Sequence, residues 1–291
     1  MFDQIVIIGS LICFLIVGLA FKTRNFKTIG EFTIQRNKLK WFPISAGISM
    51  TFVGGAALLN MASLGYSFGW YTLVDPFAMI GGILIVIVFI KSYQQDNGVT
   101  ISNLLSNSDR RLSILIGVIT SVVFILILAA QFVALSKLLS PYYSSVHPLI
   151  LTTVLSAAIF SYVFWGGFSS VTKTDILQLA FLGLFLVLPV VYFILMNKPA
   201  SPEYSNNVIK FTKMPLNLMI LLSFPLLFIP LSQDINIRVK SAVSKKQAIT
   251  GLLVGAGLYA TIVVLSSFLG IALAKAGMTL NDPETAFTTF F

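Results

Sequence analysis

Long apolar runs with almost no charge restrict the fold of this chain more than any other feature of its sequence. A run of about 18 or more apolar residues is long enough to cross the roughly 30 Å hydrocarbon core of a bilayer as a helix. Only 10% of the 291 residues are charged, and the mean hydropathy is +0.93. Because lipid offers the backbone no hydrogen-bond partners, such runs become helices. The sequence therefore predicts an all-α, polytopic transmembrane helix bundle.

Eight runs are candidate spans within a single transmembrane domain of residues 1–291. They cover about Ile5–Phe21, Trp41–Tyr66, Thr72–Ile90, Leu112–Ser136, Pro148–Trp165, Ile176–Met196, Met214–Leu231 and Ala248–Ala274. A signal peptide is the alternative for the first run. Its Met-Phe-Asp-Gln start lacks a basic region, however, and the positive charges follow the apolar run. We therefore interpret it as a leading transmembrane helix.

Lysine and arginine are shared unevenly between the two sides of the predicted bundle. Fourteen of the 19 basic residues follow the first, third, fifth and seventh spans; the other five are Lys137, Lys198, Lys210, Lys213 and Lys275. By the positive-inside rule the richer side is cytoplasmic, so we expect a multi-pass protein of the cell membrane with its N-terminus outside. This asymmetry and the anionic headgroups of the lipid bilayer explain the net charge of +9, so we expect no nucleic acid partner.

Few residues have the chemistry of an enzyme or of a metal centre. The single cysteine, Cys13, lies inside the first apolar run, and the single histidine, His147, has no second metal ligand near it. The sequence contains no P-loop, nucleophile elbow or dinucleotide fingerprint. We therefore expect neither catalysis nor a metal site from these residues.

Two of the predicted spans contain residues that disfavour a continuous helix. Gly54 and Gly55 lie within the second span, and each costs a helix about 1 kcal/mol relative to alanine. They predict local unwinding or a close contact, and small-residue packing between helices is the alternative. Pro225 and Pro230 lie within the seventh span, where prolines either break a membrane helix or only kink it.

Asp75 is the one carboxylate inside a predicted membrane zone, and Pro76 follows it. Carboxylates inside a membrane are costly and mostly face a cavity or a partner, which makes Asp75 a candidate functional residue. A solvated charge at the start of the third span is the other interpretation.

The two interrupted spans lie five helices apart, which fits an inverted repeat of five plus five helices. Transporters of this kind place a discontinuous helix at the start of each repeat, where freed carbonyls coordinate a cation and helix ends hold the substrate. On this scheme residues 5–21 form an extra leading helix and residues 41–196 the first repeat. Residues 214–274 form part of the second repeat, and residues 275–291 form an outer loop.

Four stretches of the sequence carry a family resemblance: "TIGEFTIQRNKLKWFPISAG", "TFVGGAALLNMASLGYSFG", "YVFWGGFSSVTKTDILQ" and "SQDINIRVKSAVSKKQA". They resemble the sodium:solute symporter family, which includes sodium-coupled proline, pantothenate and sugar transporters and has the LeuT-like inverted-repeat fold. The third is the most specific, since Gly166, Gly167, Thr174, Asp175 and Gln178 match the family signature.

The resemblance implies a secondary active transporter that couples sodium influx to uptake of a small organic solute by alternating access. It implies sodium binding by the backbone carbonyls of Met50 and Val53, and an ion exit path past Asp175. It implies solute contacts from Phe52, Gly55, Ala57, Asp75 and Ser232. Carbonyl oxygens suit sodium because they replace hydration water without adding a formal charge.

Two departures from the family limit what the resemblance implies. Phe52, Ala56 and Ala57 are apolar where sugar-transporting relatives are polar, so an amino acid or small carboxylate fits better than a sugar. The last stretch, "GMTLNDPETAFTTFF", resembles the outer loop before core helix 8, whose hydroxyls complete the sodium site. A truncated, non-transporting fragment is therefore one alternative. The membrane sensor domain of a signalling protein is another, because the same membrane domain can be fused to signalling modules.

The polar stretch at residues 161–178 is predicted to be a cytoplasmic turn between two spans. Gly166 and Gly167 would let the chain reverse. Thr174 would cap the following helix, and Asp175 would lie in its first turn, where its charge favours the helix dipole.

Overall fold

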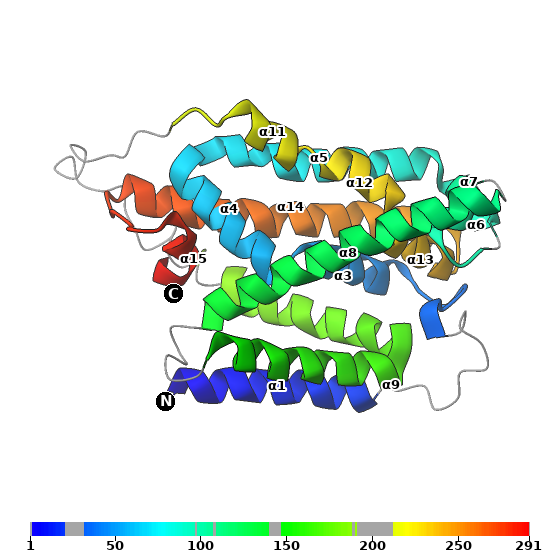
Figure 1. The fold of residues 1–291 in the computed structure, drawn as a ribbon, viewed down its shortest axis with the longest axis horizontal. Helices are drawn as coiled ribbons and strands as arrows, with labels where there is room; N and C mark the ends of the chain where they lie inside the picture. The colour runs from blue at the N-terminus through cyan, green and yellow to red at the C-terminus, as the bar shows by residue number, and fades with distance from the viewer. Residues whose placement is uncertain are drawn as a thin grey trace.

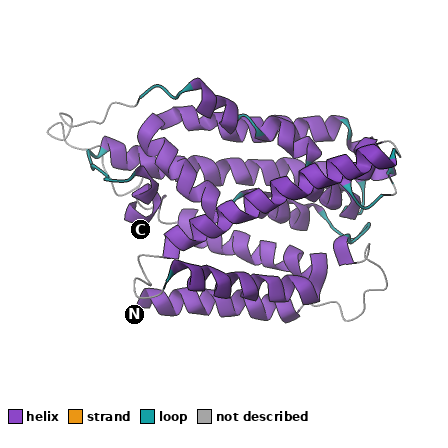
Figure 2. Cartoon of the chain, viewed as in Figure 1, coloured by secondary structure: helices purple, strands orange, loops and turns teal. Residues whose placement is uncertain are grey.

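The computed structural model describes residues 2–20, 32–96, 98–106, 109–139, 147–187, 190 and 212–290. Within these residues the chain forms a bundle of helices (Figure 1), and Figure 2 shows helices and loops but no strand. The one β-type pairing among them is an isolated parallel bridge between Leu39 and Ala242. The helical bundle predicted from the apolar runs is thus confirmed.

The helices differ widely in length, from 5 to 35 residues. They are α1 (Phe2–Ala20), α3 (Trp41–Phe52), α4 (Gly55–Phe68), α5 (Val74–Val88), α6 (Ile90–Gln95), α7 (Ile101–Ser106), α8 (Arg110–Leu139), α9 (Pro148–Leu182), α11 (Leu216–Leu222), α12 (Pro225–Leu231), α13 (Gln233–Ser241), α14 (Lys245–Lys275) and α15 (Ala286–Phe290). Short 3-10 turns occupy Gly69–Leu73 and Pro283–Thr285, and a π-helical turn, Gly183–Val187, follows α9.

Four helical runs have the length and the hydropathy of a membrane-spanning segment: Gly55–Val88, Arg110–Leu139, Thr152–Leu182 and Lys245–Lys275. A fifth candidate is α11 and α12 together with α13, which are bent by 44° where they meet. Most of α8 is exposed, including large apolar side chains such as Ile125 and Leu126. In water such a surface would be unfavourable, whereas lipid accommodates it.

Two of these runs contain a glycine with positive φ. Gly69 has a φ of 63° and ends α4, and Gly167 has a φ of 56° and interrupts α9. Positive φ is readily available to glycine because it has no Cβ. At Gly69 the chain passes from α4 into the 3-10 turn that leads to α5, so the second and third predicted spans are separate helices.

α9 reverses direction at Gly167 and packs both of its halves against α1. Gly18 of α1 lies so close to Tyr162 that an added Cβ would come within 2.6 Å of its ring. Four residues earlier in α1, the ring of Phe14 lies 5.4 Å from that of Phe181. A straight helix would place residues 162 and 181 about 28 Å apart, so α9 is a hairpin, drawn in green beside α1 in Figure 1.

The site of this reversal is as predicted, but the start of the next helix is not. Helix resumes directly after Gly167 rather than at Ile176, so Thr174 is not an N-cap and Asp175 does not lie in a first turn. The hydroxyl of Thr174 donates within the helix, to the carbonyls of Ser170 and Val171. Because such hydroxyls donate hydrogen bonds to backbone carbonyls one turn earlier in the same helix, the polar stretch does not require a loop. The predicted end of that span near residue 196 lies outside the described residues.

The region predicted as an outer loop, residues 275–291, contains a 3-10 turn and α15. Ala286 at the start of α15 is fully buried. The hydroxyl of Tyr66, near the end of α4, donates to the carbonyl of Met278 over 2.8 Å and accepts from the amide of Leu280. The segment is therefore packed against the end of α4.

α14 is the central helix, and it packs closely along α3, α4 and α5 (orange in Figure 1). Glycines permit this approach. A Cβ added to Gly270 would lie 1.9 Å from the carbonyl oxygen of Ala62, and one added to Gly65 would lie 2.2 Å from that of Ser267. These contacts involve backbone, which cannot move aside as a side chain can. Small residues at such contacts are typical of membrane helices.

Replacing Gly270 by alanine tests this packing. We expect G270A to destabilise the protein by about 1–3 kcal/mol, the range for overpacking, because α4 and α14 would be pushed apart. The matched control is Gly257→Ala in the same helix, since nothing lies within 4 Å of a Cβ added there. Thermal unfolding in detergent measures both. Equal unfolding midpoints for G270A and G257A would contradict the packing.

Candidate functional site

The first predicted interruption is a gap between two helices. α3 ends at Phe52 and α4 begins at Gly55, so Val53 and Gly54 are not helical. Val53 has φ −88° and ψ 63° and is buried. The gap lies one residue before the glycine pair that predicted it. The alternative of small-residue packing also applies, because a Cβ on Gly54 would lie 2.3 Å from a side chain of α8.

The gap releases backbone carbonyls from helical hydrogen bonding. In a continuous helix the amide of Ala56 would bond the carbonyl of Phe52, and that of Ala57 would bond the carbonyl of Val53. Here the amide of Ala56 donates to a side chain of α8 instead, and the amide of Ala57 donates to Gly54 over 3.0 Å. The carbonyls of Phe52 and Val53 have therefore lost their helical donors.

The side chain that meets the gap is Gln131 of α8. Its Oε1 accepts from the amide of Ala56 over 3.2 Å, and its amide group lies against Gly54. Our sequence interpretation did not single out Gln131. The available signal was its isolation, since it is the one amide in the apolar stretch of α8 from residue 114 to residue 135.

Most of the residues predicted for the site gather at this gap. Met50 and Val53 are buried, and Phe52, Gly55 and Ala57 are half-buried. Thr51, between Met50 and Phe52, is exposed. Asp75 and Ser232 lie on other elements, and no hydrogen bond among the described residues joins either of them to the gap.

A second interruption follows α12, as the prolines predicted. α12 ends at Leu231 and α13 begins at Gln233, so Ser232 lies at the bend. The hydroxyl of Ser232 is buried and has no hydrogen-bond partner among the described residues. The carbonyl of Pro230 accepts a hydrogen bond from Tyr93 of α6. Burial raises the pKa of Tyr93 to about 12, so its hydroxyl remains a donor at neutral pH.

Arg238 of α13 is the most unusual side chain in the bundle, because it is a full charge with only 1% of its surface exposed. Its Nη2 lies 3.0 Å from Oδ2 of Asp175 and 2.9 Å from the hydroxyl of Thr51. Arg238 therefore joins α13 both to α9 and to the last turn of α3. Asp175, predicted as an ion exit residue, is an ion-pair partner in this conformation.

Only some of the hydrogen-bond donors of the Arg238 guanidinium group have a partner among the described residues. Asp234, one turn earlier in α13, lies 3.9 Å from its Nε, and the ring of Phe168 lies 5.6 Å from its Cζ. Its Nη1 lies directly against Gly47 of α3, where an added Cβ would come within 1.6 Å. Nε and Nη1 have no hydrogen-bond partner among the described residues. Donors left unpaired in a buried site favour water or another oxygen ligand there.

Asp75 is buried near the start of α5, which rules out the solvated interpretation. Its Oδ1 accepts a hydrogen bond of 2.6 Å from the hydroxyl of Tyr259 in α14. The tyrosine is neutral, so this contact does not balance the charge of the carboxylate. Nothing in the sequence pointed to Tyr259, because a tyrosine in an apolar helix is ordinary.

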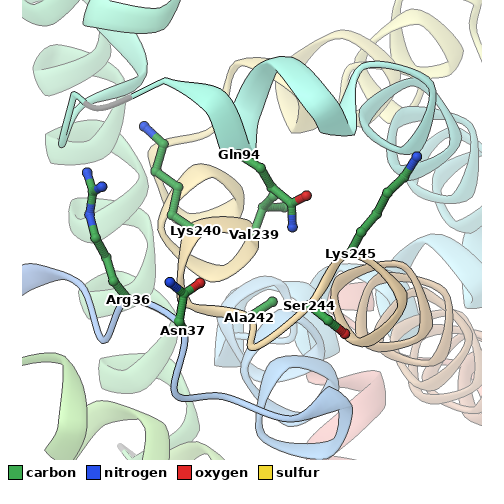
Figure 3. Close-up of a pocket in the computed structure, with 8 residues that line it drawn as sticks. All are labelled: Arg36, Asn37, Gln94, Val239, Lys240, Ala242, Ser244 and Lys245. Atoms are coloured by element: carbon green, nitrogen blue, oxygen red, sulfur yellow. The ribbon is translucent and has the colours of Figure 1, made fainter.

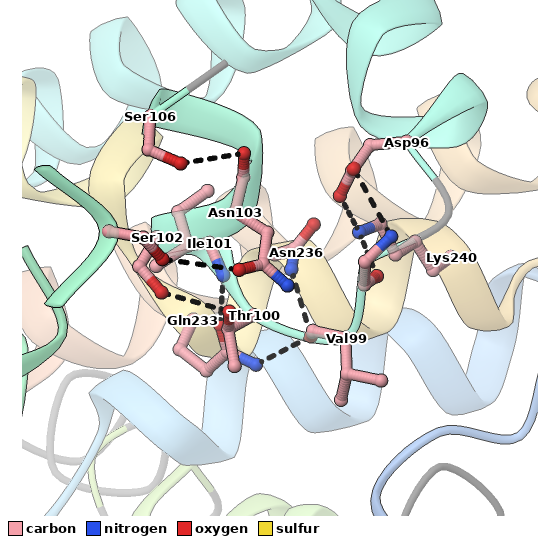
Figure 4. A network of polar contacts seen from close by, with 12 residues as sticks. Asp96, Val99, Thr100, Ile101, Ser102, Asn103, Ser106, Gln233, Asn236 and Lys240 are labelled. Atoms are coloured by element: carbon pink, nitrogen blue, oxygen red, sulfur yellow. Dashed lines mark hydrogen bonds and ion pairs between the residues drawn. The ribbon is translucent and has the colours of Figure 1, made fainter. Parts of the chain in front are cut away.

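The polar helix α13 is anchored on its other face by the loop between α6 and α7 (Figure 4). Gln233 donates to the carbonyl of Val99 and accepts from the amide of Ile101, and Asn236 also donates to Val99. One turn further on, Lys240 lies 2.5 Å from a carboxylate oxygen of Asp96. The spacing of 233, 236 and 240 places these side chains on one helix face. α13 is therefore held from both sides.

Comparison with known proteins agrees with this geometry. A model of the sodium:solute symporter family matches residues 32–288. A solved structure of a sodium-coupled sialic acid symporter, in a substrate-bound outward-open state, superimposes with a TM-score of 0.78 at 15% sequence identity. That match covers 100% of this chain and 68% of the symporter chain. No curated protein matched the sequence.

The fold and the two helix breaks define a multi-pass membrane protein with the LeuT-like fold, and the family match makes it a transporter rather than an enzyme. The chain belongs to the sodium:solute symporter family. Its function is sodium-coupled transport of a solute across a membrane, and sodium is the coupling ion. The family and fold expected from the four stretches are confirmed.

The buried ion pair gives a test by double-mutant cycle. We expect Arg238→Met to destabilise the protein by about 3–5 kcal/mol, because it leaves Asp175 buried without its cation. Adding Asp175→Asn to that variant should recover part of the loss. Thermal unfolding of both single variants and the double variant measures the coupling.

The control is the pair of Lys137 and Glu284, which is about half exposed. Removing its charge with Glu284→Gln should change stability by about 1 kcal/mol or less. Strictly additive effects of the two substitutions at Arg238 and Asp175 would show that the pair is not coupled.

Proposed function

We propose that the gap between α3 and α4 binds the coupling sodium through the backbone carbonyls of Met50 and Val53. The support is the hydrogen-bond pattern, since the carbonyl of Val53 lacks its helical donor and Met50 lies in the turn before it. Carbonyl dipoles replace the hydration shell of a monovalent cation without binding it too tightly. The freed carbonyl of Phe52 is a further oxygen beside the same gap.

We propose that the solute is a small amino acid or carboxylate that binds beside this gap. The gap residues Phe52, Gly55 and Ala57 offer an apolar wall with few hydrogen-bonding side chains, which suits an aliphatic part of the solute better than a sugar. Asp75 and Ser232 are the proposed polar contacts. Each side chain can take another polar partner. The Asp75 carboxylate has only a neutral hydrogen-bond partner, and the Ser232 hydroxyl has none among the described residues.

We propose that the Arg238–Asp175 pair closes the path between the sodium site and the cytoplasm. The pair lies beside Thr51, next to the residues proposed to hold sodium, and Arg238 is almost fully buried. A cation that leaves along this route would compete with Arg238 for the carboxylate of Asp175. Asp175 then acts as the ion exit residue when the pair opens.

We propose the following topology. The N-terminus faces outward, and the protein resides in the cell membrane, with its apolar surface in the lipid bilayer and no nucleic acid partner. Residues 1–291 form one transmembrane domain, with residues 5–21 leading, 41–196 as the first repeat, 214–274 within the second and 275–291 outside. The exposed apolar surface of α8 supports contact with lipid.

Transport by proteoliposomes containing the protein tests the proposed function. With an inward sodium gradient, labelled amino acids or small carboxylates should accumulate, whereas labelled sugars should not. Replacing sodium with choline should reduce uptake to the level of empty liposomes. Uptake that is unchanged in choline would refute the sodium site at the gap, and uptake of sugars alone would refute the proposed solute class.

Neutralising Asp175 tests the exit path. We expect D175N to slow sodium-coupled turnover about tenfold or more, because the departing ion loses its carboxylate. Folding yield should fall less, because Arg238 keeps its contacts with Asp234 and Thr51. Asp96→Asn is the matched control, since Asp96 also pairs with a buried cation, Lys240, but on the other face of α13. If D175N and D96N slow turnover equally, the cause is a loss of stability of α13 and not a defect in ion exit.

A further inference from the structure

A basic pocket lies where the chain before α3 meets the connection from α13 to α14 (Figure 3). Its volume is about 270 Å³. It is lined by Arg36, Asn37, Gln94, Val239, Lys240, Ala242, Ser244 and Lys245. In Figure 3, Arg36 and Lys245 are on opposite sides, with Gln94 and Val239 between them. The pocket is separate from the gap between α3 and α4.

The lining of this pocket has three basic side chains and no carboxylate. Asp96, which is outside the lining, pairs with Lys240 and offsets one of the three charges. Arg36 and Lys245 are exposed, and the flanking Lys38, Lys40 and Lys246 add to the positive potential. The side chains of Asn37, Gln94 and Ser244 add neutral hydrogen-bonding groups. This combination favours an anion over a cation or an apolar ligand.

The start of α14 adds to this preference. α14 is 31 residues long and begins with Lys245 and Lys246, and no acidic residue occupies its first turn. The N-terminal end of a helix carries a partial positive charge, so basic residues there are unfavourable and an anion is favourable. Ser244 caps the helix by accepting from the amide of Gln247. The charges of Lys245 and Lys246 are thus repelled by the partial positive charge of the helix end, and a bound anion would reduce this repulsion.

We propose that this pocket binds a phosphate group, either that of an anionic lipid headgroup or that of a soluble phosphate. Arg36 and Lys245 would contact it from opposite sides, with Lys240 and the start of α14 behind. Basic side chains and helix N-termini are the groups that proteins use for phosphate. Since one water takes up about 30 Å³ of liquid, the pocket holds a phosphate together with several waters.

The walls of the pocket connect the two interrupted helices. The amides of Lys38 and Leu39 donate to the carbonyl of Ser241, and the amide of Val243 donates to the carbonyl of Leu39, over 2.8–2.9 Å. The residues before α3 are thereby paired with those after α13. A phosphate held between Arg36 and Lys245 would bridge the same two segments and stabilise their pairing.

The test measures thermal unfolding of the purified protein in nanodiscs, so its result does not depend on sodium-coupled transport. In phosphatidylcholine nanodiscs, inorganic phosphate should raise the unfolding midpoint relative to chloride at equal ionic strength, since a ligand of the folded state stabilises it. In the double variant Arg36→Gln/Lys245→Gln, the apparent affinity for phosphate should fall about tenfold.

A second arm separates the two sources of phosphate. If the ligand is a lipid headgroup, phosphatidylglycerol nanodiscs should raise the midpoint without added phosphate and abolish the response to it. If the ligand is soluble, the response to phosphate should be the same in both kinds of nanodisc. Either outcome supports a phosphate site.

The matched control is Lys246→Gln, which removes the same charge from the same helix turn but from outside the pocket lining. Because it removes one flanking charge and leaves the lining intact, it should weaken the phosphate response much less than the double variant does. The proposal is overturned if neither phosphate nor phosphatidylglycerol raises the midpoint. It is equally overturned if K246Q loses as much response as the double variant, because the effect would then be general charge screening.

Discussion

Backbone hydrogen bonding in the absence of water is the constraint on which the rest of this structure depends. A helix in lipid keeps its amides and carbonyls paired, so the gap at Val53 and Gly54 exists only where other helices surround it. Gln131 of α8 satisfies one amide of the gap, and α14 packs along α3 and α4 on either side of it. The carbonyls that remain are what make a sodium site possible.

The nine-residue helix α13 connects the features that matter for transport. One face is tied to the loop between α6 and α7 through Gln233, Asn236 and Lys240. Through Arg238 it also contacts α3 and α9, and its end is paired with the segment before α3. A movement of α13 must therefore disturb the Arg238–Asp175 pair and the basic pocket together. This arrangement physically links the proposed ion exit to the proposed phosphate site.

The sequence predicted the bundle, the places where its helices break and most of the residues at the gap. Glycine pairs and prolines act on the backbone of their own helix, so the breaks they cause can be predicted without knowing which helices pack beside them. The polar stretch near Asp175 was misread as a loop because its hydroxyl groups bond within the helix, which hides them from the membrane. The contacts that Gln131, Arg238 and Tyr259 make could not be predicted, since each joins residues that are distant in the sequence.

By itself, the sequence determined that this chain is a membrane-embedded bundle of helices, two of them interrupted, because the length of its apolar runs and their interruptions depend on local chemistry alone. Only the tertiary structure decided where the charges reside. From the sequence alone, Arg238 is one more basic residue of a segment predicted to be cytoplasmic. In the structure it is buried against Asp175 and Gly47. Burial and pairing are set by the packing of distant helices, and the energy of a charge depends on that packing more than on its neighbours in the chain.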